Sequence, residues 1–153
     1  MDKLKSTPRL SPTVVSVLLT QTDTTVGFLS QNKQKLQDIK SRSSAKPFIK
    51  VYKNFKSLQT RIPSVHKNLL RRSKKTTFIV KNRAFRVSSY HLHSTLLHAS
   101  WYYSTSANAA GKNFERVFCE AKADIIIEDK NLLQEKMASS LIQLNAKHKR
   151  RLR

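Results

Sequence analysis

Short runs of β-branched and aromatic residues constrain the fold most strongly, because they recur along the whole chain. Val14–Leu19 is continuously apolar, which is typical of a central strand buried on both faces. Phe48–Tyr52 alternates apolar and polar residues, which predicts a strand with one buried face. Further strands are expected at Thr76–Val80, Ala84–Val87, Trp101–Ser104, Asp124–Ile127 and Ser140–Leu144. The chain is therefore expected to fold around a β-sheet.

Helical patterns lie between these strands without strict alternation. Gln31–Ile39 is expected to be helical, because Leu36 and Ile39 share one helical face. Other helices are expected over Asn54–Gln59, Ser64–Arg72 with Ser64 as N-cap, Leu92–His98, and Asn113–Ala121 with Phe114, Val117 and Phe118 on one face. The fold class predicted is α/β (α+β), with a twisted mixed β-sheet and flanking helices. We expect an extended lead-in over 1–12 and a single domain over 13–153.

The charge of the chain is strongly one-sided. Thirty Lys and Arg residues against nine Asp and Glu give a net charge of +21. Such a charge favours a polyanionic partner such as a nucleotide or RNA, and a merely solvated basic surface is the alternative. The apolar run Val14–Leu19 is too short to span a bilayer, and the single Cys119 fits a reducing compartment. We therefore expect a cytoplasmic protein that makes no membrane contact.

The stretch Thr22–Ile49 has the order of an anion-binding site. It is expected to contain the end of a strand, a tight turn at Gly27, a helix and a cationic loop. The loop carries Lys40, Arg42 and Lys46, whose side chains suit phosphate oxygens. A solvated basic loop is the alternative from these residues alone.

A second polar block, Ser104–Asn108 with the sequence STSAN, follows an apolar strand. Ser106 and Asn108 are suited either to hydrogen-bonding a nucleotide or to shaping a turn. The chain has two glycines, and Gly111 lies just after this block. No metal ligands are assigned, since the histidines around His93 have no Cys or carboxylate beside them in the sequence.

Together the motifs resemble the YrdC-like threonylcarbamoyl-AMP synthases from about Val14 to the C-terminus. The shared motifs are T-D-T at 22–24, K-x-R at 40–42, K-P at 46–47 and S-T-S-A-N at 104–108. The resemblance implies that ATP is bound by Lys40, Arg42, Lys46, Ser106, Asn108 and Arg153. It also implies that threonine is bound by Thr24, Thr77, Arg86 and Ser139.

The function implied by this resemblance is L-threonylcarbamoyladenylate synthesis for tRNA threonylcarbamoyladenosine modification. The enzyme would convert L-threonine, bicarbonate and ATP into threonylcarbamoyl-AMP and pyrophosphate without a covalent nucleophile, with Mg2+ held by the substrate phosphates. Its expected partners are tRNA or other RNA and the downstream tRNA threonylcarbamoyl transferase. An RNA-binding YrdC-fold protein without synthase activity is the alternative. A second alternative is a basic, ribosome-associated or structural protein without a small-molecule site.

Overall fold

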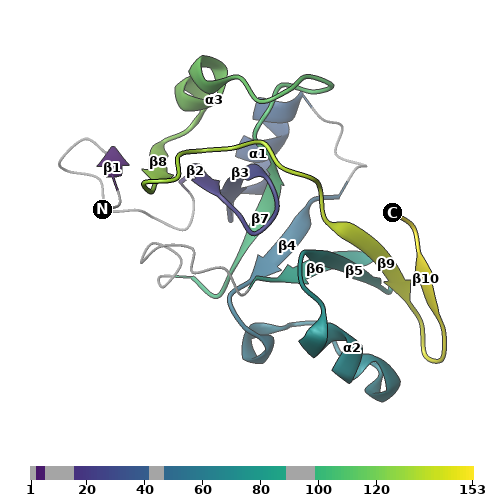
Figure 1. The fold of residues 1–153 in the computed structure, drawn as a ribbon. Coiled ribbons are helices and arrows are strands. Elements are labelled where there is room, and N and C mark those ends of the chain that lie inside the picture. The colour runs from purple at the N-terminus through teal and green to yellow at the C-terminus, as the bar shows by residue number, and fades with distance from the viewer. Residues whose placement is uncertain (1–2, 6–15, 42–46, 89–98) are drawn as a thin grey trace.

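The computed structural model describes residues 3–5, 16–41, 47–88 and 99–153, with the backbone alone for 3–5. In these residues ten strands form one mixed sheet, in the order β1-β8-β2-β3-β7-β4-β6-β5-β9-β10 (Figure 1). The predicted fold class is confirmed. The strands are β1 Lys3–Lys5, β2 Leu18–Gln21, β3 Val26–Ser30, β4 Ile49–Tyr52, β5 Thr76–Val80, β6 Arg83–Val87, β7 Trp101–Ser106, β8 Ile125–Glu128, β9 Ser140–Leu144 and β10 Lys149–Arg151.

The helices described cover one face of the sheet at its two ends. They are α1 Lys33–Lys40, α2 Lys67–Arg72 and α3 Arg116–Lys122, with the 3-10 turns η1 Phe55–Ser57 and η2 Ser64–His66. Tyr103 packs with the core under α1 and α3, and Trp101 with the core beside α2. These two residues are two positions apart in β7, so their side chains share a face of the sheet. Tyr102 packs on the opposite face with Leu18 and Leu29.

Helix α1 forms as its sequence predicts, but it starts two residues later and ends one residue later than expected. Asn32 caps it by accepting a hydrogen bond from the Lys35 N–H at 3.2 Å. Leu36 is fully buried and Ile39 packs against the same core. The helix ends at Ser41, which adopts the left-handed conformation with φ of 47°. Lys40 is thereby placed in the last turn of α1, on its buried side.

The tight turn predicted at Gly27 is wrong, because Gly27 lies within β3. The chain reverses earlier, at residues 22–25, between β2 and β3. A side chain at position 27 would be tightly packed: a Cβ atom would lie 3.1 Å from the Thr105 carbonyl oxygen and 3.2 Å from Thr22 Cγ2. Glycine therefore suits the close approach of β3 to its neighbours here.

Two smaller expectations are also wrong. Ser64 lies inside η2 and does not cap it, since no side chain caps this turn. Val117 does not share the apolar face of α3, because it is 77% exposed and Cys119 is the buried residue of that helix. Within the expected extended lead-in, strand β1 pairs with β8. The helix expected at Leu92–His98 lies outside the described residues.

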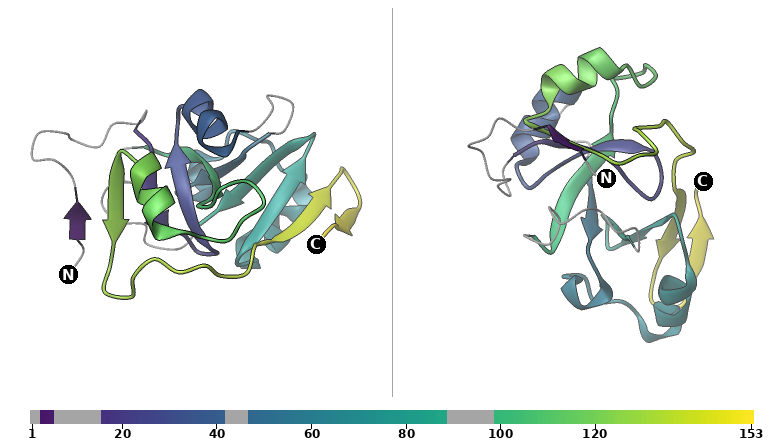
Figure 2. Two further views of the ribbon diagram at one scale, coloured as in Figure 1. Left: turned by 90° about the horizontal axis from the view of Figure 1, so that it is seen from above. Right: turned by 60° about the vertical axis from the view of Figure 1, so that its left-hand side comes forward.

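A long segment, residues 129–139, connects β8 to β9 across the sheet (Figures 1 and 2). We call it the crossing segment. It is fixed to the β2–β3 hairpin by three hydrogen bonds. The Val26 N–H donates to the Gln134 carbonyl at 3.1 Å, and the Gln134 N–H donates to Gln21 Oε1 at 2.8 Å. The Lys136 N–H donates to Thr25 Oγ1 at 3.0 Å. The crossing segment thus brings its last residue, Ser139, to the side of the sheet where the β2–β3 turn lies.

Among the helices that the structure describes, none combines the length and the apolar character needed to cross a membrane.

Candidate functional site

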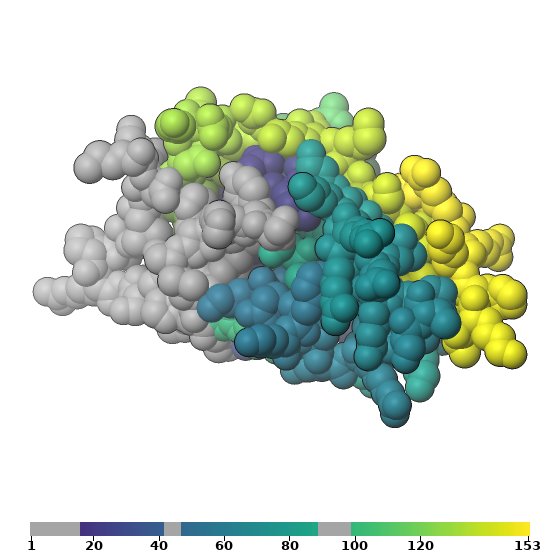
Figure 3. Space-filling view, turned by 60° about the horizontal axis from the view of Figure 1, so that its bottom comes forward, coloured from purple at the N-terminus to yellow at the C-terminus, as the bar shows by residue number. Residues whose placement is uncertain are grey.

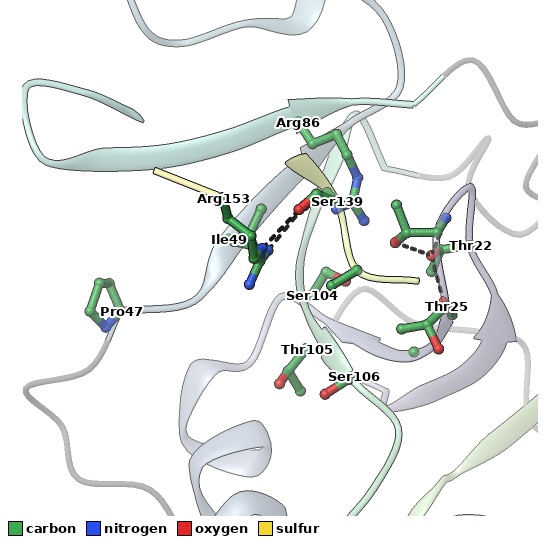
Figure 4. A pocket seen from close by; sticks show the side chains of 13 residues that line it. Thr22, Thr25, Pro47, Ile49, Arg86, Ser104, Thr105, Ser106, Ser139 and Arg153 are labelled. Carbon is green, nitrogen blue, oxygen red and sulfur yellow. Dashed lines mark hydrogen bonds between the residues drawn. The ribbon is translucent and has the colours of Figure 1, made fainter. Parts of the chain in front are cut away.

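A cavity of about 340 Å³ lies on the face of the sheet opposite the helices (Figure 4). Two arginines, Arg86 and Arg153, enter it from different parts of the chain, and we call it the arginine cavity. Most of its other lining residues carry hydroxyl groups. The lining residues are Thr22, Thr24, Thr25, Gly27, Pro47, Ile49, Arg86, Ser104, Thr105, Ser106, Ala138, Ser139 and Arg153.

Arg86 is a buried cation of this cavity and forms an ion pair with a buried carboxylate. Its residue exposure is 5%, and its Nε lies 3.1 Å from Oδ1 of Asp23. The orientation falls short of a hydrogen bond, so the contact is electrostatic. Burial lowers the pKa of Arg86, and the charge of Asp23 opposes that effect. Because an arginine stays charged in proteins, the cavity holds a fixed cation.

The predicted threonine-binding residues meet at this arginine. Arg86 Nη1 donates a hydrogen bond of 3.3 Å to Thr77 Oγ1, and that hydroxyl lies 2.7 Å from Ser139 Oγ. Thr77 is fully buried and lies behind the cavity wall, whereas Ser139 and Thr24 line the cavity. Thr77, Arg86 and Ser139 thus form one hydrogen-bonded cluster, and Thr24 lines the same cavity.

Arg153 approaches the same serine from the other side. Its Nε donates to the Ser139 carbonyl oxygen at 2.9 Å, and its backbone oxygen accepts from the Leu141 N–H at 3.0 Å. Figure 4 shows the Arg153 side chain beside Ser139 and Ile49. The tail after β9 thus folds back as β10 and delivers a second guanidinium to the cavity.

Lys40, predicted to bind ATP, braces the STSAN loop. Its buried ammonium donates to the carbonyl oxygens of Ser106 and Asn108, at 3.1 and 2.9 Å, and also to Asn108 Oδ1. Ser106 Oγ donates to Asn108 Oδ1 at 2.9 Å, and Asn108 Nδ2 donates to the Lys112 carbonyl at 2.6 Å. Lys40 and Asn108 therefore adjoin the cavity through Ser106, which lines it.

The turn between β2 and β3 presents its threonines through internal hydrogen bonds. Thr22 Oγ1 donates to the Thr25 carbonyl at 2.6 Å and lies 3.2 Å from Thr24 Oγ1. Gln21 Nε2 donates to the Thr24 carbonyl at 3.4 Å. This network orders the turn at the mouth of the cavity, where Thr24 was expected to act.

Several residues of the site were not assigned from the sequence. Ser104 and Ile49 line the cavity. Strand alternation could have predicted both, because residues two positions apart on a strand share a face. Ser104 is two positions before Ser106 in β7, and Ile49 is two positions after Pro47. Asp23 lies within the T-D-T motif, but nothing in the sequence pairs it with Arg86. That ion pair depends on the tertiary fold alone.

Two predicted ATP ligands, Arg42 and Lys46, lie outside the described residues. Pro47, which directly follows Lys46 in the sequence, lines the cavity. No group of three His, Cys, Asp or Glu side chains gathers in the described ranges. Asp23, the carboxylate beside Arg86, is engaged by that arginine.

Comparison with known proteins now gives the family. The family model Sua5/YciO/YrdC, described as telomere recombination, matches residues 16–153. The chain belongs to this family. Among curated proteins, none matches it in sequence.

Solved structures of the family share the fold. Escherichia coli YciO superimposes with a TM-score of 0.71 at 18% identity, covering 91% of this chain and 82% of YciO. MTH1692 from Methanobacterium thermoautotrophicum gives 0.66 at 19% identity, with 90% and 79% covered. Sua5 of P. abyssi complexed with L-threonine gives 0.72 at 18% identity, with 90% of this chain but 50% of Sua5 covered. The chain thus spans about half the length of that Sua5.

Proposed function

We propose that this chain is an L-threonylcarbamoyladenylate synthase that uses L-threonine, bicarbonate and ATP. The observation that carries the proposal is the composition of the arginine cavity. It brings Thr24, Arg86 and Ser139, expected for threonine, together with Ser106 and Arg153, expected for ATP. Membership of the family and the fold shared with a threonine-bound Sua5 support the same activity.

The buried arginine is suited to the carboxylate of an amino acid. The Arg86 guanidinium is oriented by Asp23 and Thr77, so little side-chain entropy is lost when a carboxylate binds. The hydroxyls of Ser139 and Thr24 can hydrogen-bond the polar groups of a small substrate. A cavity of about 340 Å³ with few large apolar side chains favours a short polar amino acid at this end.

In this proposal the phosphates of ATP lie beside Ser106 and Arg153, next to the amino-acid end of the cavity. Ser106 and the loop braced by Lys40 adjoin the cavity on one side, and Arg153 enters it on another. In the proposed reaction the charge of Arg153 stabilises the departing pyrophosphate, together with the predicted ligands Arg42 and Lys46. Mg2+ bound to the triphosphate would neutralise further charge there.

The chemistry that this arrangement serves needs no protein nucleophile. The threonine amine and bicarbonate form a carbamate with loss of water. A carbamate oxygen then attacks the α-phosphate, and the bond to the pyrophosphate oxygen breaks. The protein must hold the carbamate and the α-phosphate in line, which the positions of Arg86 and Arg153 on one cavity support.

The proposal is tested by pyrophosphate release from ATP, with threonine or bicarbonate omitted in turn. We expect release only when both are present, and a loss of about a thousandfold in an Arg153→Ala variant. Product identity is checked by mass spectrometry of threonylcarbamoyl-AMP. Arg150→Ala is the matched control, because Arg150 is an exposed arginine on β10 near Arg153 and does not line the cavity.

Release that does not depend on threonine would exclude this substrate. A folded protein that binds RNA but releases no pyrophosphate would instead be the RNA-binding member of the family without synthase activity.

A further inference from the structure

A second cavity lies on the other face of the same strands. It also has a volume of about 340 Å³, and it opens between α1 and the segment after η1. We call it the basic groove and define it by Lys33, Lys50, Gln59, Asn82, Arg83 and Tyr103. Ile49 lines the arginine cavity and Lys50 the basic groove, as alternation along β4 requires. Pro47 lines both cavities, so they adjoin there, but the lysines and the arginine that define the groove line only the groove.

Lys50 holds its charge against aromatic rings in this groove. Its Nζ lies 4.2 Å from the ring centroid of Trp101 and 5.5 Å from that of Tyr103. It also donates to Gln59 Oε1 at 3.3 Å. Such cation–π contacts fix an ammonium group that would otherwise be freely mobile. Lys50 is therefore a preorganised cation at the floor of the groove.

The charges of the basic groove are not neutralised from within. Lys33 and Arg83 join Lys50, and the described lining residues include no Asp or Glu. Partial burial lowers the pKa of Lys50, and repulsion from Arg83 lowers it further. Three cations around one cavity raise the free energy of the unliganded protein, and a bound anion would relieve that repulsion.

The groove combines these cations with an aromatic ring and neutral hydrogen-bonding groups. Tyr103 lines it together with Phe48 and Tyr52, while Gln59 and Asn82 carry amides. Cationic side chains bind phosphate groups, whereas an aromatic ring can stack on a planar base and amide groups can hydrogen-bond its edge. A cavity of about 340 Å³ is large enough for one base with its sugar and phosphate.

We propose that the basic groove binds a nucleotide unit, with its phosphate at Lys33, Lys50 and Arg83 and its base against Tyr103. The unit can belong to single-stranded RNA or to a free nucleotide, since both present the same chemistry. The proposal does not depend on synthase activity, because none of these residues reaches the arginine cavity.

The surroundings of the groove extend its positive charge. Lys53, Lys56 and Arg61 are exposed on the segment that follows β4. Figure 3 shows the blue-to-teal segment with η1 and α2 as a continuous surface beside the yellow C-terminal strands. A nucleotide strand leaving the groove would meet further cations along this surface.

Trp101 supplies a direct measurement, because it is the single tryptophan of the sequence. A phosphate that pairs with Lys50 draws the ammonium away from the indole and changes its emission. The probes are AMP and a ten-nucleotide single-stranded RNA, each titrated at several salt concentrations. RNA affinity is measured in parallel by fluorescence polarisation of a labelled strand.

The test variant is the double variant Lys50→Gln with Arg83→Gln. The single variant Arg83→Gln is measured as well, because Arg83 is exposed and its replacement should not disturb folding. The matched control is Lys122→Gln with Lys130→Gln, which removes the same charge. Lys122 also lies near a ring, with its Nζ 5.7 Å from the Phe118 centroid. We expect RNA binding to be about tenfold weaker in the test variant and less than about twofold weaker in the control. In the test variant the slope of the logarithm of the binding constant against the logarithm of the salt concentration should be smaller by about 1.4.

Equal losses in the test and control variants, or no change in Trp101 emission at saturation, would overturn the proposal. Emission changes with RNA alone identify a nucleic-acid strand as the ligand. Emission changes with AMP that compete with RNA identify a site for the nucleotide itself. Failure of the synthase assay leaves all of these outcomes unaffected.

Discussion

The arginine cavity and the basic groove have similar volumes, about 340 Å³ each, yet hold their charges differently. In the cavity, Arg86 is buried against Asp23, and the surrounding groups are mostly hydroxyls. In the groove, Lys50 and Arg83 are partly or fully exposed and no carboxylate lies among the described lining residues. A buried, paired cation selects a ligand by geometry, whereas exposed cations select it by charge and respond to salt.

The largest expected difference is between two arginines on one strand. Arg86→Ala leaves the Asp23 carboxylate buried without its counter-ion, so we expect the free energy of unfolding to fall by about 3–5 kcal/mol. Pyrophosphate release should be lost as well. Urea unfolding followed by circular dichroism measures the stability.

The matched control is Arg83→Ala, three positions earlier on β6 and exposed to solvent. Its stability should stay within about 0.5 kcal/mol of the wild type. Similar losses at positions 83 and 86 would contradict the distinction between a buried and an exposed cation. Restoration of stability by adding Asp23→Asn to Arg86→Ala would strengthen it.

Two lysines give the next comparison. Lys40→Met removes a buried ammonium that donates to the Ser106 and Asn108 carbonyls, so we expect a loss of about 2–3 kcal/mol. Lys50→Met should cost much less, because the Lys50 ammonium is partly exposed and donates one weak hydrogen bond to Gln59. Thermal unfolding of both variants checks the order. A greater loss at Lys50 than at Lys40 is the result that would disprove it.

A smaller effect is expected from two threonines. Thr77→Val removes a buried hydroxyl that contacts both Ser139 and Arg86, at an expected cost of about 1 kcal/mol and a higher KM for threonine. Thr60→Val, on the basic groove side and partly exposed, should leave both quantities nearly unchanged. Steady-state kinetics with threonine as the varied substrate separates the two. An unchanged KM in Thr77→Val would remove Thr77 from the binding network.

The smallest effect concerns the protonation of Lys50. Its pKa in the folded protein lies below the ordinary lysine value because of burial and Arg83, so folding weakens proton binding there. The contribution of this group to stability therefore rises as the pH increases from the folded pKa to the unfolded pKa. We expect Arg83→Gln to move the Lys50 pKa upward. NMR titration of methylated lysine signals measures it, and an unchanged or lower value would contradict the repulsion.

The sequence predicts local structure well where a single period governs it. Phe48–Tyr52 and Thr76–Val80 form strands because β-branched or alternating residues favour them, and α1 forms where Leu36 and Ile39 share a face. The turn predicted at Gly27 is wrong because the main close contact of Gly27 is with Thr105, 78 positions away in the sequence, and not with a local turn. Pattern alone does not reveal such contacts.

The site shows the same limit. Motif resemblance assigned Thr24, Arg86 and Ser139 to one ligand, and the fold places them around one cavity. The assignment to threonine stays a prediction. Neither the Asp23–Arg86 ion pair nor the bracing role of Lys40 is visible in a linear pattern, because each joins segments at least 60 residues apart. The basic groove was missed for a related reason, since its cations come from α1, β4 and β6.

The crossing segment has a consequence for the order in which the molecule assembles. Its bonds from Gln134 to Gln21 and from Lys136 to Thr25 each close a loop of more than 100 residues. Loop closure over such distances is slow and entropically costly, so the β2–β3 and β5–β6 hairpins should form before the crossing segment binds to the β2–β3 hairpin. The arginine cavity would then be completed last. A ligand that binds there would stabilise the contact between the crossing segment and the β2–β3 hairpin and slow its opening.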